Sequence, residues 1–76
     1  MTRLLTGKDL DMIRRAQELG RIGQVLEREL VGAGGVSVHI RRSGEAWGQP
    51  CIIELVEWAP GMQSRQFFSS VAEMHR

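Results

Sequence analysis

The residue types best suited to covalent chemistry in this chain are one cysteine, Cys51, and one mid-chain histidine, His39. A thiolate with a neighbouring imidazole as its base forms a common nucleophilic pair. Apolar and polar residues alternate over residues 36–42, as in a strand with one buried face, and residues 51–58 read as a second strand that is apolar on both faces. If the apolar side chains share one face, His39 and Cys51 lie on opposite faces. We therefore predict a buried, unreactive thiol, no catalytic residue and no enzyme activity.

Metal and phosphate sites are not favoured either. His39, Cys51, Glu54 and His75 have ligand-type side chains, but their spacing matches no zinc motif and strand alternation separates them. The glycine-rich residues 32–35 follow a predicted helix and precede a predicted strand, whereas phosphate loops run from strand into helix. We read these glycines as a helix C-cap, and we expect no metal and no cofactor.

A protein-binding surface is the best supported site. Glu54 would be costly inside the core, so it fixes which face of residues 51–58 points outward, and Arg41 and His39 on the neighbouring strand would pair with it. Aromatic, aliphatic and arginine side chains gather on this outward face and its loop, which is typical of interfaces. The predicted partner-binding residues are His39, Arg41, Trp47, Ile52, Glu54, Val56 and Trp58. The alternative is that Phe67, Phe68 and Val71 fold back and cover this face.

Nucleic-acid binding is the second interpretation. A basic hairpin with a stacking aromatic would consist of Arg41, Arg42, Trp47 and Arg65. Nucleic-acid binding rewards a strong basic excess, but the chain has a net charge of only +1 and glutamates lie among these arginines. A protein partner is therefore favoured over nucleic acid.

The first element is predicted to be a long helix. Thr6 and Asp9 are spaced as a capping box, which predicts a helix start. Apolar and small residues then recur at intervals of four and three as far as Leu30, which indicates an amphipathic helix of about six turns. Within it, Gly20 and Gly23 each lower helix propensity. We read them, together with Ala16, as a packing groove for the sheet, for a bulky side chain or for a second subunit.

The remaining elements predict an α+β fold. Residues 36–42 and 51–58 form a hairpin joined by a loop over 43–50, and Pro60-Gly61 suits the centre of a type II turn. Residues 63–75 fit a short C-terminal helix, which gives an αββα order on an antiparallel β-hairpin. The alternative is αβββ with a three-stranded antiparallel sheet, because a two-stranded sheet is marginally stable.

Length and composition limit the function classes. Seventy-six residues make a single domain over 1–76, with a composition typical of folded soluble proteins. A lone cysteine and the absence of an apolar run long enough to span a membrane predict a cytoplasmic protein with no membrane partner. By analogy with other small proteins, we expect a non-enzymatic protein-binding module: a regulator or inhibitor, of phage or mobile-element origin, that occludes a partner's surface. A homodimeric accessory subunit is a further alternative.

Overall fold

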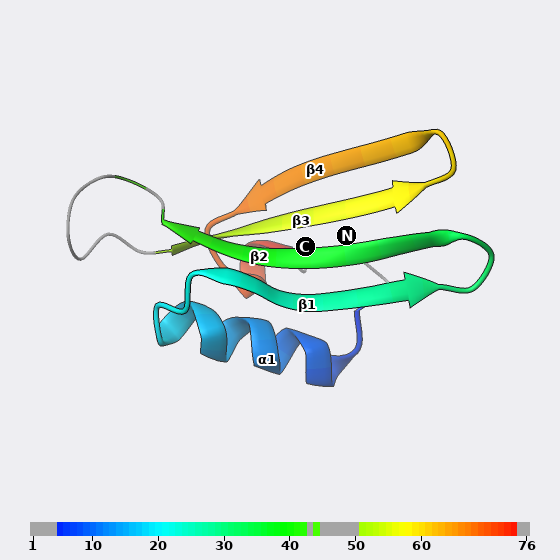
Figure 1. The fold of residues 1–76 in the computed structure, drawn as a ribbon. Coiled ribbons are helices and arrows are strands. Elements are labelled where there is room, and N and C mark those ends of the chain that lie inside the picture. Colours follow the sequence, from blue (N-terminus) through cyan, green and yellow to red (C-terminus); the bar gives the residue numbers. More distant parts are fainter. Residues whose placement is uncertain (1–4, 43, 45–50, 75–76) are drawn as a thin grey trace.

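The computed structural model describes residues 5–42, 44 and 51–74. Its elements, in chain order, are α1 (Gly7–Glu18), β1 (Gly23–Leu30), β2 (Gly34–Arg42), β3 (Cys51–Ala59), β4 (Met62–Phe68) and α2 (Val71–Met74). Each strand pairs antiparallel with the next, so the sheet order is β1-β2-β3-β4 (Figure 1). The predicted α+β class is confirmed. The predicted strand number is wrong, because the described residues contain four strands instead of two or three.

The start of α1 matches the prediction. The Asp9 backbone N–H donates to Thr6 Oγ1 at 3.2 Å, and the Thr6 backbone N–H donates to Asp9 Oδ2 at 3.0 Å. This capping box satisfies two of the amides that a helix N-terminus leaves unpaired. Asp9 is buried and also forms an ion pair with Arg28 of β1, so the cap ties the helix to the sheet.

The end of α1 differs from the prediction, because the helix stops at Glu18 instead of continuing to about residue 31. Gly20 has a φ of +67° and donates its N–H to the Gln17 carbonyl at 3.1 Å. The Arg21 N–H donates to the Ala16 carbonyl at 2.9 Å. These two bonds with a left-handed glycine form a Schellman motif, which closes a helix.

The predicted packing groove of Ala16, Gly20 and Gly23 is therefore wrong, because the three residues do not share a helix. Ala16 is buried in α1, Gly20 closes that helix and Gly23 is the first residue of β1, with a φ of +130°. Leu26 and Leu30 suggested a helical stripe because they are four residues apart. Four residues are also two strand periods, and the register with β2 places both leucines on one face of the sheet.

Two turns depend on left-handed backbone conformations. Gly32 and Ala33, with φ values of +93° and +74°, lie in the turn between β1 and β2. This segment is a hairpin turn and not the predicted helix C-cap. Gly61 has a φ of +75° after Pro60, as the second central position of a type II turn requires, so that turn is confirmed.

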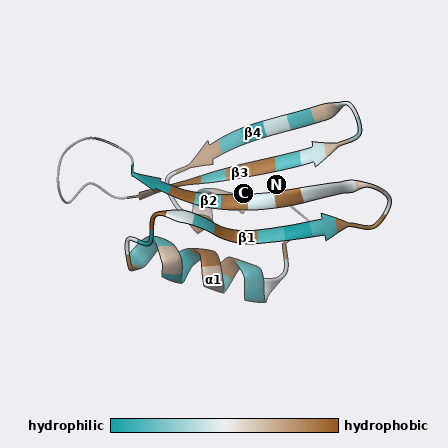
Figure 2. Cartoon of the chain, viewed as in Figure 1, coloured by the Kyte–Doolittle hydropathy of each residue, from teal (hydrophilic) through white to brown (hydrophobic). Residues whose placement is uncertain are grey.

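The core lies between the two helices and one face of the sheet. Its strand residues are the predicted ones: Val36, Val38, Ile40, Cys51, Ile53 and Leu55. Ile13 and Met74 contribute from α1 and α2. Polar and apolar bands alternate along the strands, as expected for a sheet covered on one face (Figure 2). The side-chain amide of Gln17 donates to the Cys51 and Ser69 carbonyls at 2.7 Å each, which fixes α1 to one end of the sheet.

The C-terminal segment combines the two predicted alternatives. Residues 62–68 form β4 beside β3, and residues 71–74 form the short helix α2. Phe67 and Phe68 are adjacent in a strand, so they point to opposite faces. Phe68, Val71 and Met74 pack against the core on the side of α1. The segment therefore widens the sheet and does not fold over its other face.

Candidate functional site

The sheet face turned away from α1 and α2, called the open face below, presents side chains from all four strands. The antiparallel register places Glu54 opposite His39 and Phe67, and Val56 opposite Ser37 and Arg65. Directly opposed side chains lie about 5 Å apart at their Cβ atoms, so neighbouring rows are in contact range. The open face comprises Gln24, Glu27, Glu29, Gly35, Ser37, His39, Arg41, Ile52, Glu54, Val56, Trp58, Gln63, Arg65 and Phe67.

The structure brings most of the predicted site residues together. Every predicted partner-binding residue except Trp47 lies on the open face, and Trp47 lies outside the described residues. Of the predicted nucleic-acid residues, Arg41 and Arg65 are on this face. Arg42 is opposite Cys51, and by strand alternation both belong to the helix-covered side.

The centre of the open face is a buried carboxylate between two arginines. Glu54 is only 2% exposed, although neither helix covers this face. Arg41 Nε donates to Glu54 Oε1 at 2.6 Å, and Arg65 Nη1 donates to Oε2 at 3.4 Å. Both arginines reach Glu54 diagonally, one from β2 and one from β4, because their direct partners on β3 are Ile52 and Val56. The carboxylate thus holds one guanidinium group on each side.

The arginines also decide the ionisation of Glu54. Burial acts to raise the pKa of this carboxyl group, but the hydrogen bond and charge of Arg41, with the charges of Arg65 and His39, outweigh burial. The pKa of Glu54 therefore lies below its ordinary value of 4.5, and the group is ionised at neutral pH. The side chains of Arg41 and Arg65 are 54% and 55% exposed, so further N–H donors of each guanidinium face solvent.

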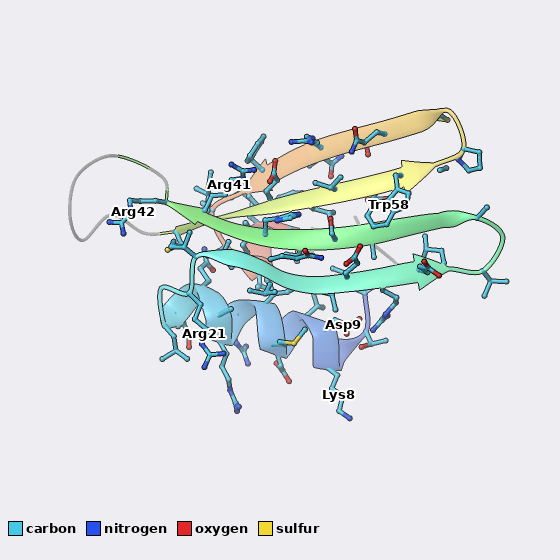
Figure 3. All side chains as sticks on the ribbon, in the orientation of Figure 1. Lys8, Asp9, Arg21, Arg41, Arg42 and Trp58 are labelled. Carbon is cyan, nitrogen blue, oxygen red and sulfur yellow. The ribbon has the colours of Figure 1, made fainter. Side chains whose placement is uncertain are left out.

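Two aromatic side chains lie on the same face as this ionic centre. An added Cβ at Gly35 would lie 2.0 Å from Trp58 Cζ2, so the indole occupies space that only glycine leaves open. Figure 3 shows Trp58 on β3 directed toward the neighbouring β2. Phe67 of β4 is 55% exposed and directly opposite Glu54. The sequence did not assign Phe67 to this site, because residues 63–75 were interpreted as a helix.

A shallow hollow of about 300 Å³ lies over the ionic centre. Ser37 and His39 line it, and Ser37 Oγ is 3.2 Å from His39 Nε2. Arginine donors and a partly buried indole line it as well. This surface can accept a carboxylate or carbonyl oxygen beside an apolar group. Cys51 does not line this hollow, since its thiol is buried in the core on the other side of the sheet.

Further observations limit the chemistry of the described residues. No group of three or more His, Cys, Asp or Glu side chains among them is arranged to hold a metal ion. No helix in this part of the chain is long and apolar enough to cross a membrane. Comparisons with protein-family models, with curated proteins and with solved structures give no match for this chain.

Proposed function

We propose that this chain is a non-enzymatic protein-binding module that docks its open face onto a partner protein. The observation that supports the proposal is the buried Glu54, which holds Arg41 and Arg65 on the same face as the aromatic rings of Trp58 and Phe67. Arginine and tryptophan are enriched among residues that dominate binding energy in interfaces. Holding their side chains in place before binding reduces the entropy that association would otherwise remove.

The charge distribution favours a protein over nucleic acid. Glu54 offsets part of the arginine charge at the centre, and Glu27 and Glu29 of β1 lie on the same face. A phosphate backbone would approach these carboxylates as well as the arginines. A protein partner can instead place acidic or carbonyl groups over Arg41 and Arg65 and apolar side chains against Phe67.

The biological role that follows from such docking is occlusion. A small domain has little room for further activities, and covering a partner's surface is enough to regulate or inhibit that partner. This step depends on analogy with other small proteins. The same analogy suggests a phage or mobile-element regulator. A homodimeric accessory subunit is less well supported, because a two-fold contact between open faces would bring the same arginines together.

The direct test is capture of a partner by the 76-residue chain. Immobilised protein is exposed to lysate of the source cell, and the captured protein is identified by mass spectrometry, purified and titrated. Phe67→Gln and Arg65→Gln should each weaken binding roughly tenfold or more. Met62→Gln is the matched control, since Met62 is 75% exposed on the same strand but on the other face.

The proposal fails if the captured protein binds both open-face variants as tightly as wild type while all variants retain the wild-type melting temperature. Fluorescence-anisotropy titrations with single-stranded oligonucleotides at two salt concentrations test the alternative. Salt-sensitive binding that Arg65→Gln removes would support nucleic acid in place of a protein partner.

A further inference from the structure

A second concave surface lies between α1 and the beginning of β1, away from the ionic centre. This α1–β1 groove has a volume of about 990 Å³. It is lined by Lys8, Asp11, Met12, Arg15, Ala16, Leu19, Arg21, Ile22, Gln24 and Val25. Gln24 is the one lining residue that also belongs to the open face.

The groove exposes apolar side chains that the fold does not cover. Leu19 is 67% exposed, Ile22 55% and Met12 41%. Leu19 is the C-cap residue of α1 and follows Met12 by seven residues, so the two side chains lie on one stripe of the helix. Ala16 lies between them and is buried. Because its side chain is small, the groove is deeper at this position. Contiguous exposed apolar groups on a small domain often mark an interaction site.

The rim of the groove is cationic. Lys8 and Arg15 occupy the same helical stripe as the two apolar residues, at spacings of four and three. Figure 3 shows Lys8 and Arg21 near opposite ends of α1. Asp11 is the acidic residue among those lining the groove, and Arg14 offsets its charge through an ion pair of 2.9 Å. The rim therefore complements negative charge along its length.

We propose that the α1–β1 groove binds an acidic amphipathic helix of a partner protein. The twelve residues of α1 span about 18 Å, which matches a bound helix of about three turns. Apolar side chains at helical spacing would enter between Met12, Leu19 and Ile22, while Asp or Glu side chains would meet the cationic rim.

Two other occupants fit the groove less well. A second copy docked groove to groove would place Lys8, Arg15 and Arg21 against the same three residues, and like charges would meet. A membrane surface binds protruding apolar residues, whereas these side chains line a concave groove. The charge pattern and the shape together favour an acidic helical peptide.

The test is a selection from a displayed library of helical peptides against the 76-residue chain, with the Leu19→Gln/Ile22→Gln double variant as counter-target. Enriched peptides should carry apolar residues at helical spacing flanked by Asp and Glu. Their affinity should fall about tenfold or more in the double variant and in Arg15→Gln. Val31→Gln is the control, because Val31 is a fully exposed apolar residue outside the groove.

Several results of the selection and its controls would overturn the proposal. These are no enrichment over the counter-target, enrichment of basic peptides, enrichment of peptides with strand-like alternation, and a wild-type dimer that Leu19→Gln dissociates. Binding of phosphatidylserine vesicles through the same residues would also overturn the proposal, because it would show that the groove contacts a membrane surface. The outcome is independent of the open-face proposal, because Phe67→Gln should leave peptide binding unchanged.

Discussion

The two faces of the sheet bury side chains of the same strands by different means. On the helix-covered face, Val38 and Ile53 are fully buried beneath α1 and α2. On the open face, Glu54 and Val56 are 2% and 5% exposed without a covering helix. Their neighbours are long side chains such as Arg65, which is directly opposite Val56 and paired with Glu54, and the aliphatic stem of such a side chain can cover apolar surface. The comparison suggests that the first face stabilises the fold and the second is organised for contact.

The largest expected effect on the free energy of unfolding comes from making the same Val→Ala substitution on each face of the sheet. Val38→Ala should lower the free energy of unfolding by about 2 to 3 kcal/mol, because rigid helices leave a cavity. Val56→Ala should lower it by about 1 kcal/mol, since flexible side chains around it can close the space. Urea denaturation of both variants measures the difference. Equal losses would show that the two faces are packed alike and contradict the comparison.

The next effect concerns the ionic centre. Glu54→Gln leaves two partly exposed arginines without their carboxylate and should lower the free energy of unfolding by about 1 to 2 kcal/mol at neutral pH. The folded-state pKa of Glu54 is below 4.5, so its ionised form favours folding. This contribution is present above about pH 4.5 and is lost as the pH falls through the folded-state pKa.

The difference between wild type and Glu54→Gln should therefore shrink in acid, as measured by urea denaturation between neutral and acidic pH. Glu27→Gln is the control, since Glu27 is an exposed carboxylate on the same face that accepts a hydrogen bond from Gln24. Its effect should stay within about 0.5 kcal/mol. A Glu54→Gln difference that does not change with pH would argue that the carboxylate's charge is not what stabilises this face.

Local patterns were enough to predict part of the fold and of the site. Strict alternation over 36–42 defined β2 and its buried face, and the high cost of burying Glu54 without a partner oriented β3 correctly. The cross-strand partners Arg41 and His39 followed from that orientation and are confirmed. These predictions succeeded because the alternation over 36–42 fits a strand only and the cost of burying Glu54 decides the orientation of 51–58 by itself.

The errors arose where the local pattern fits both a helix and a strand, so that the pairing strand decides between them. Residues 23–30 fit a helix as well as a strand, and they become a strand because β2 supplies the hydrogen-bonding partner. Adjacent Phe67 and Phe68 also suit a helix, but β4 completes its hydrogen bonds against β3. Because residues 63–75 fit a helix as well as a strand, neither the contact of Arg65 with Glu54 nor the exposure of Phe67 follows from the sequence.

The smallest effect tests whether the open face is ordered before any partner binds. A methyl group in Gly35→Ala would lie 2.0 Å from Trp58 Cζ2, at the far end of a side chain that can rotate. The indole should therefore move toward solvent while the backbone stays in place. Loss of this contact is partly offset by the better strand propensity of alanine, so the net loss should be at most about 1 kcal/mol.

The displacement should be measurable even where stability hardly changes. In a Trp47→Phe background, acrylamide quenching reports Trp58 alone, and Gly35→Ala should increase it. Gly7→Ala is the control, because an added Cβ there meets nothing within 4 Å. Unchanged quenching in Gly35→Ala would mean that the indole does not rest on β2. The ionic centre alone would then order the open face before binding. The indole of Trp58 would become ordered only when a partner binds.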